Sequence, residues 1–123
     1  MTTTAQSIVD RLKQPEVSQD EVLKYLRHDA ALVRVNAIEA AARLAKDNDR
    51  LIGIISNEAR RPENAVRLLG TATVGHVAVG CLLRIANAQA EKAAMELVKE
   101  WPENDRGDLT WYLKSEGLLN DTT

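Results

Sequence analysis

The sequence predicts an all-α protein, and three observations support this prediction. The apolar residues are dominated by 17 Ala and 15 Leu, whereas Val and Ile number only 10 and 6. Phe is absent, and strands favour β-branched and aromatic side chains while Ala and Leu favour helices. Apolar residues also recur at intervals of three and four along most of the chain, which is the period of an amphipathic helix. The abundance of Ala further indicates that the helices pack closely.

The length and the charge of the chain limit the classes to which it can belong. It has 123 residues and a formal charge of −2, from 16 Lys and Arg against 18 Asp and Glu. This length predicts one domain, residues 1–123, that buries about two-thirds of its unfolded surface. The hydrophobic content of 45% excludes a disordered chain, and the near balance of charge excludes a polybasic nucleic-acid binder.

The cysteine content and the hydropathy predict where the protein is located. The single cysteine, Cys81, cannot close a disulfide within the chain, and this predicts a reducing compartment. No stretch reaches the ~18 apolar residues of a membrane span, and the polar residues 1–4 do not resemble a signal peptide. We therefore expect a cytoplasmic protein that does not bind a membrane.

Three helices are expected in the first part of the chain. The first covers residues 4–13 and ends before Pro15, which cannot continue a helix. The second begins after Ser18, which opens a capping box, and it ends near residues 28–29. The third covers residues 31–46 and carries apolar residues on two faces, so we expect it to lie between neighbouring helices.

Five more helices are expected between the turn at residues 47–49 and the C-terminus. Their approximate ranges are 51–59, 63–73, 76–86, 89–100 and 108–115. Gly70 falls inside one of them, where Gly costs about 1 kcal/mol relative to Ala, so we expect another backbone to pass close to it. Gly75 is expected to break the chain after that helix, and Gly117 is expected to cap the last helix.

The chain also shows signs of an internal repeat. A shift of 33 residues aligns Val33-Arg34 with Val66-Arg67 and places the small residue Ala37 on Gly70. A single helix pair of this length cannot bury both its faces, so repeated pairs must stack on one another. We therefore expect about three stacked pairs, with the first and last helices of the chain covering the two ends.

Residues 29–44 carry a pattern that resembles a HEAT or HEAT-like (armadillo-type) repeat. They read DAALVRVNAIEAAARL, with an acidic turn residue, then Val-Arg, then small residues three, six and seven positions after the Arg. Residues 63–70, ENAVRLLG, resemble a degraded second copy. The resemblance implies a short right-handed α-solenoid of about three helix pairs with terminal capping helices, whose inner groove binds a macromolecule. It also implies that Arg34 is structural and bonds the turn residue Asp29 or a neighbouring repeat.

We expect no enzymatic activity, no cofactor and no metal site. Neither His28 nor His76 has a possible metal ligand three or four residues further on, and both are expected at a turn or a helix edge. No phosphate-binding loop, dinucleotide-binding motif or hydrolase motif occurs in the sequence. Cys81 lies in an apolar run, where burial raises the pKa of a thiol and makes it unreactive. The carboxylates of the turn at residues 47–49 are interpreted as helix caps.

Charge is unevenly distributed along the chain. Residues 27–84 hold nine basic and six acidic side chains, whereas residues 85–123 hold four basic and eight acidic ones. Eight of the basic side chains can form a band that contacts phosphates: Arg27, Arg34, Arg43, Lys46, Arg50, Arg60, Arg61 and Arg67. The acidic residues between them favour a solvated, salt-bridged surface instead. Nucleic-acid binding through residues 27–84 is therefore the alternative function.

A protein partner suits a surface with charges of both signs better. The third helix carries an outward polar stripe of Asn36, Glu39, Arg43 and Lys46, and the helix over residues 89–100 carries a similar one. The expected partner-binding residues on a concave helical face are Asn36, Glu39, Arg43, Arg67, Lys92, Glu96 and Lys99. We expect a non-catalytic recognition module, either an adaptor or an inhibitor or immunity-type protein. The partner's identity is left open.

Two further alternatives concern self-association and the aromatic residues. The chain is expected to be a monomer or a weak homodimer, and an apolar strip at an open end of the stack would give it a structural, homo-oligomeric role. Trp101, Trp111 and Tyr112 either pack in the C-terminal cap or act as interface anchors, for which large rings are suited.

Overall fold

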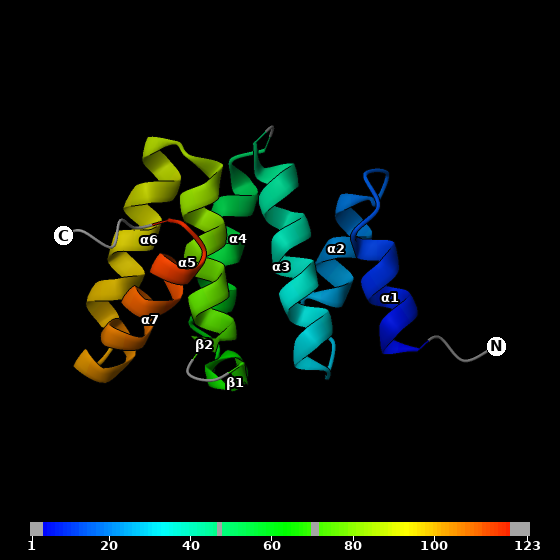
Figure 1. Ribbon diagram of the computed structural model, residues 1–123. Coiled ribbons are helices and arrows are strands. Elements are labelled where there is room, and N and C mark those ends of the chain that lie inside the picture. The colour runs from blue at the N-terminus through cyan, green and yellow to red at the C-terminus, as the bar shows by residue number, and fades with distance from the viewer. Residues whose placement is uncertain (1–3, 47, 70–71, 119–123) are drawn as a thin grey trace.

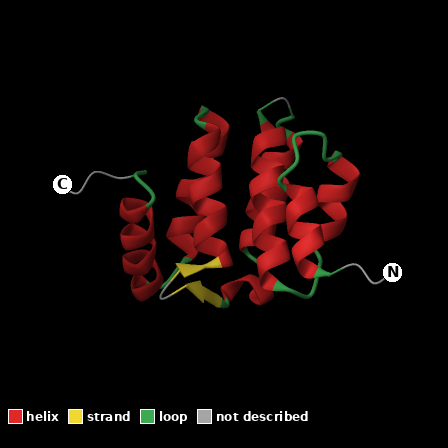
Figure 2. Cartoon of the chain, turned by 45° about the vertical axis from the view of Figure 1, so that its right-hand side comes forward, coloured by secondary structure: helices red, strands yellow, loops and turns green. Residues whose placement is uncertain are grey.

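The computed structural model describes residues 4–46, 48–69 and 72–118 of the chain, and in this part the chain is predominantly helical, as predicted (Figures 1 and 2). The elements in chain order are α1 (Ala5–Leu12), α2 (Gln19–Tyr25), α3 (Ala31–Ala45), α4 (Arg50–Ala59), the 3₁₀ helix η1 (Pro62–Ala65), β1 (Arg67–Leu69), β2 (Ala72–Thr73), α5 (Val74–Ile85), α6 (Ala88–Glu100) and α7 (Glu103–Ser115). The last helix begins five residues before its expected start, and the second ends at Tyr25 rather than near residue 28.

Short polar side chains begin four of the helices. In each case the N-cap side chain accepts a hydrogen bond from the backbone N–H three residues later, which satisfies a donor that the helix itself leaves unpaired. These N-cap residues are Thr4, Ser18, Thr73 and Asn87. The cap expected at Ser18 is therefore confirmed. The expected cap at Gly117 is confirmed as well, because this residue ends α7 with a φ of +74°.

Helix α3 lies at the centre of the molecule. It packs against α1, α2, α4 and α5, and this confirms the expectation that neighbours cover it on more than one side. Val33 and Ile38 are fully buried, and so is a series of small side chains that includes Ala37 and Ala41. The small side chains allow the neighbouring helices to approach α3 closely.

The helices stand side by side in a row that begins at α1 and ends at α6 and α7 (Figure 1). Helix α3 packs between α1 and α5, while α4 packs against α3, α5 and α6. Helix α7 packs on α5 and β2, and it buries only Leu109 and Leu113. The two ends of the described chain consequently lie at opposite ends of the row.

The prediction of a helix over residues 63–73 is wrong. Pro62 opens a single 3₁₀ turn, and β1 then pairs antiparallel with β2, with Arg67 opposite Thr73. The side chain of Asn64 is buried and donates to the carbonyl of Glu58 at 2.7 Å, which fixes a turn where a helix would continue. Thr73 is an extended residue that caps α5, so the segment ends as a strand.

The repeat alignment and the glycine predictions change with this correction. Val66-Arg67 enters a hairpin and Val33-Arg34 lies in α3, so the shift of 33 residues aligns segments of different structure. Gly75 does not break the chain but lies in the first turn of α5, where an added Cβ would come 3.3 Å from the Trp101 ring. Gly70 lies outside the described residues.

Candidate functional site

The polar stripe predicted on α3 is only partly exposed. Asn36 is 8% exposed, and its side-chain amide donates to the carbonyl of Leu32 at 2.9 Å, so the expectation that it faces a partner is wrong. The physical reason is that α3 has packing neighbours on more sides than its sequence pattern predicted. Glu39 is half-buried, and Arg43 and Lys46 are exposed. These three residues remain on the surface.

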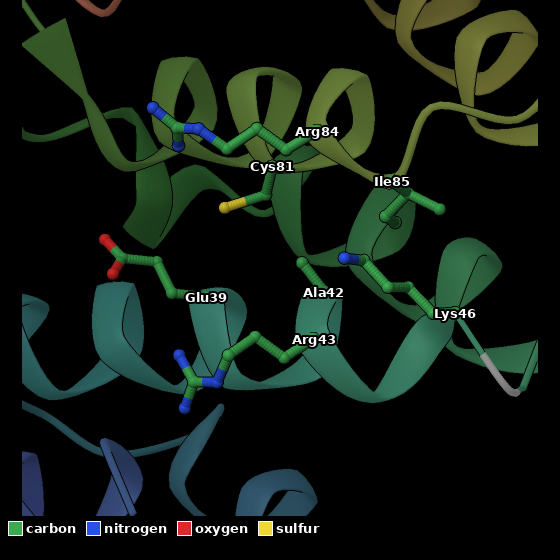
Figure 3. A pocket seen from close by; sticks show the side chains of 7 residues that line it. All are labelled: Glu39, Ala42, Arg43, Lys46, Cys81, Arg84 and Ile85. Carbon is green, nitrogen blue, oxygen red and sulfur yellow. The ribbon is translucent and has the colours of Figure 1, made fainter. Parts of the chain in front are cut away.

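The three remaining residues line a groove between α3 and α5, which we call the α3–α5 groove (Figure 3). Its volume is about 250 Å³, and its lining residues are Glu39, Ala42, Arg43, Lys46, Cys81, Arg84 and Ile85. Figure 3 shows Arg43 and Arg84 extending the same way from the two facing helices, with the Glu39 carboxylate between them. Three cationic side chains and one carboxylate therefore surround the groove, and its local charge is positive.

The charged side chains of the groove differ in how firmly they are held. Arg43 donates to the main-chain carbonyl of Leu12 at the end of α1, and Arg84 donates to Glu116 at 3.1 Å. The side chains of Lys46 and Glu39 make no hydrogen bond or ion pair with any residue that the structure describes. Lys46 and Glu39 can therefore bind a ligand without first breaking a contact.

The floor of the groove is apolar and chemically inert. Ala42, Cys81 and Ile85 contribute nearly buried side chains to it. Burial raises the pKa of the Cys81 thiol to about 12, with a smaller contribution from the nearby Glu39 carboxylate. A thiol in this state stays neutral at physiological pH, which confirms the expected burial of Cys81 and leaves the groove without a thiolate.

The structure does not bring the other predicted partner-binding residues to this groove. Lys92 and Glu96 line a separate groove of about 340 Å³ between α4 and α6. Lys99 lies on α6 beside a third groove, bordered by α5 and α7. Arg67 lies on β1, where it forms an ion pair with Asp108 at 3.4 Å. The expected residues are therefore distributed over several surfaces.

Arg34 is structural, in agreement with what the resemblance implies. Its Nη1 donates to the main-chain carbonyls of His28 and Asp29 at 2.9 and 2.7 Å, rather than to the Asp29 carboxylate. Its Nε donates to Oδ1 of Asn64 at 2.8 Å, and its Nη2 donates to the carbonyl of Glu63 at 3.0 Å. The side chain thus joins the turn before α3 to the turn after α4.

Three further arginines of the basic segment are paired within the chain. Arg27 and Arg61 both bind the carboxylate of Glu58, at 3.2 and 2.7 Å, and Glu58 is only 3% exposed. Arg60 binds Glu100 through two nitrogens, with a shortest distance of 2.8 Å. These pairs connect neighbouring helices and turns, so carboxylates of the chain itself engage the three guanidinium groups.

Both histidines have structural roles, as expected. The Nδ1 atom of His28 accepts a hydrogen bond from the N–H of Ala30 at the turn before α3. His76 is buried in the first turn of α5 and forms a capping box with Thr73. Burial lowers the pKa of His76 below its usual value, although a hydrogen bond to the carbonyl of Asp105 opposes this effect. In the part of the chain that the structure describes, no cluster of three or more His, Cys, Asp or Glu is placed to hold a metal ion.

The aromatic residues of the C-terminal part differ in their surroundings. The Trp101 ring lies edge-on to His76, with ring centres 5.3 Å apart, and Tyr112 packs on Gly80. Both rings are half-buried and pack against α5. Trp111 is 68% exposed and takes no part in that packing.

Arg84 is a groove residue that the sequence analysis missed. Helix α5 contains one residue of the types Arg, Lys, Asp and Glu, and this is Arg84. It follows a long apolar run. A lone charge at the end of an apolar helix, three residues after a predicted buried cysteine, was the available signal. Its position opposite Arg43 depends on how α3 packs on α5, which the sequence pattern does not specify.

A comparison with protein-family models, with curated proteins and with solved structures finds no match in any of the three. None of the described helices is long and apolar enough to cross a membrane.

Proposed function

We propose that the chain is a non-catalytic recognition module that binds a protein partner through the α3–α5 groove. In this role it would act as an adaptor or as an inhibitor or immunity-type protein, in the cytoplasm. The observation that carries the proposal is the convergence of Arg43, Lys46 and Arg84 around an apolar floor, with Glu39 as the one carboxylate among the described lining residues. Such a groove suits a partner segment that presents carboxylates beside a small apolar side chain.

The arrangement of the helices supports a finer proposal about the architecture. Helices α2 and α3 pack together, and so do α4 and α5, and these two pairs follow one another along the row. Helix α6 packs on α4 and α5, and α1 covers the first pair. Arg34 bonds both its own turn and the next one, which is the contact that the HEAT-like resemblance implies. We therefore propose a short right-handed, HEAT-like solenoid. Small-angle scattering that fits a compact four-helix bundle better than an elongated row would contradict it.

A protein partner is favoured over nucleic acid for a specific reason. Phosphate binding gains from several unpaired cations along one surface, because each contact releases counterions. In this chain Arg34 is buried, and Arg27, Arg60 and Arg61 are engaged by acidic side chains. The cations of the α3–α5 groove form a local cluster that matches a short acidic segment better than a continuous phosphate backbone.

Affinity capture from the native cell with quantitative mass spectrometry tests the proposal. Lys46→Glu is expected to reduce capture of the partner at least about tenfold, because it places a second carboxylate beside Glu39 in the groove. Lys92→Glu is the matched control, since it makes the same charge change on α6, outside the groove. Arg43→Glu is less suitable, because Arg43 also bonds the main chain of α1.

The result is checked with the purified partner. Its affinity for the wild-type chain is expected to fall as salt is added, and both variants are expected to keep the wild-type melting temperature. Equal binding of the partner by Lys46→Glu would refute the α3–α5 groove. Retardation of DNA or RNA that falls steeply with salt and is lost in Lys46→Glu would instead support the nucleic-acid alternative.

A further inference from the structure

The end of the molecule formed by α5, α6 and α7 carries a groove of about 300 Å³, which we call the end groove. Among its described lining residues only Lys99 is charged, and the others include Leu83, Val98 and Leu113. Met95 lines the same groove with 62% of its surface exposed. Exposed apolar surface of this kind is typical of a binding interface, and Met side chains adapt readily to a partner.

The opposite end of the molecule carries no comparable surface among the described residues. Helix α1 buries Ile8, Val9 and Leu12, and its outward side chains, such as Gln6 and Asp10, are polar. Helices α1 and α6 lie at the two ends of the row (Figure 1). Head-to-tail association needs complementary patches at both ends, whereas a two-fold contact needs one self-complementary patch. The distribution of apolar surface therefore favours a two-fold contact.

The charges on α6 are arranged in a way that is self-complementary. Glu91, Met95 and Lys99 follow one another at four-residue spacing, so they share one face of the helix, and all three are exposed. Neither the Glu91 nor the Lys99 side chain makes a hydrogen bond or an ion pair with a described residue. When two such helices cross antiparallel at Met95, each Glu91 meets the Lys99 of the other copy.

We infer that the end groove binds the end groove of a second copy of this chain, with the two α6 helices antiparallel about a two-fold axis at Met95. Burial of Met95 and its apolar neighbours would supply the affinity, and the two Glu91–Lys99 pairs would set the register. The inference goes beyond the proposed function and shares no residue with the α3–α5 groove. Failure of one proposal therefore leaves the other standing.

Sedimentation velocity of the full chain, from micromolar to millimolar concentration, tests this inference. The wild-type mass is expected to rise with concentration towards twice the 13.6 kDa of one chain. Met95→Glu is expected to weaken association at least about tenfold, because it places two carboxylates at the axis. Glu91→Lys and Lys99→Glu are each expected to weaken it by bringing like charges together. The double variant E91K/K99E is expected to restore association, since the exchanged charges pair again.

The control is the charge exchange K92E/E96K on the part of α6 that lines the α4–α6 groove, and it is expected to associate like the wild type. All variants change exposed residues, so circular dichroism is expected to report unaltered folding. A wild-type chain that stays monomeric at millimolar concentration overturns the inference. So does dimerisation that survives Met95→Glu, or a double variant that associates no better than the two single ones.

Discussion

Arg34 is buried where two turns of the chain meet, and each of its three guanidinium nitrogens donates a hydrogen bond there. The acceptors are the carbonyls of His28, Asp29 and Glu63 and the side-chain oxygen of Asn64. Two of these acceptors lie about 30 positions further along the chain, so the side chain links the N-terminal helices to the region after α4. Arg is suited to this position because its planar fork directs donors in several fixed directions at once.

Replacement of Arg34 is expected to be strongly destabilising. Arg34→Met would leave acceptors in both turns without their donor, the buried Oδ1 of Asn64 among them, and we expect a loss of at least about 3 kcal/mol in the free energy of unfolding. Arg34→Lys is expected to recover only part of this loss, because one ammonium group cannot reach both turns. Urea denaturation of the purified variants measures both effects. A loss below about 1 kcal/mol for Arg34→Met would contradict the assigned role.

The sequence predicts single residues well where local composition decides their environment. Cys81 is buried, as its apolar run indicates, and the Ser18 cap follows from its position before a helical pattern. Asn36 was wrongly assigned to the surface, because the stripe that contains it lies beside two other apolar stripes of α3. When neighbouring helices cover all of a helix except a narrow strip, a short polar side chain beside that strip is enclosed by them. Only the packing of the neighbours determines which residues remain in that strip.

At the scale of the element, the first turn of α5 is fixed by an imidazole in a defined protonation state. Nδ1 of His76 accepts from the N–H of Thr73 at 3.1 Å, so the ring proton must be on Nε2. Nε2 then donates to the carbonyl of Asp105 in α7 at 3.1 Å. A neutral ring satisfies both bonds, whereas a protonated ring would place one N–H against another. The two hydrogen bonds that connect β2, α5 and α7 through this ring therefore require an uncharged His76.

This requirement predicts a dependence of stability on pH. Burial lowers the pKa of His76, so the unfolded chain binds a proton more readily than the folded chain does. The contribution of neutral His76 to the free energy of unfolding is complete above pH 6.5, the ordinary pKa of the group. It is lost as the pH falls towards the lower pKa of the folded chain. We expect the melting temperature to fall between pH 7.5 and 5.5, and to fall less in His76→Gln, which keeps an acceptor but does not titrate. An equal fall in both proteins, measured by thermal denaturation, would refute this account.

Two helical glycines provide a matched test of how helix propensity and packing compete. Gly53 is exposed in α4, and an added Cβ there meets nothing within 4 Å, so Gly53→Ala is expected to stabilise the chain by about 0.5–1 kcal/mol. Gly80 lies buried in α5, where a Cβ would come 3.2 Å from the Tyr112 ring. Gly80→Ala must displace that ring, so we expect it to be less stable than Gly53→Ala by at least about 0.5 kcal/mol. Chemical denaturation of both variants measures the difference.

The hairpin shows why one element was not predictable from the spacing of apolar residues. Residues 66–69 are apolar apart from Arg67, and such a short run fits a helix and a strand equally well. The choice is made by Asn64, whose buried side chain is held by Arg34 and by the carbonyl of Glu58. Arg34 is 30 residues away in the sequence, and the position of the Glu58 carbonyl depends on where α4 ends. No local pattern of apolar residues contains this information. The longer helices were predictable because many residues support each of them.

At the scale of the whole molecule, the general architecture was easier to predict than the surface that binds. The expected site included Arg67 on a helix over residues 63–73, and the hairpin places Arg67 on β1 instead. Glu39 and Arg43 therefore meet Arg84 of α5, while Lys92 and Glu96 face α4. The order of helices follows from the sequence, but the side of each helix that reaches the surface depends on contacts between distant segments.

The attachment of the C-terminal helix has a consequence for the groove. Arg84 lines the α3–α5 groove, and it also donates to Glu116 just after α7. A carboxylate that enters the groove and binds Arg84 competes with Glu116 for the same guanidinium. Binding of a ligand in the groove and packing of α7 on α5 are then thermodynamically coupled, and each weakens the other because both use the Arg84 guanidinium. Helix α7 buries only two leucines, Leu109 and Leu113.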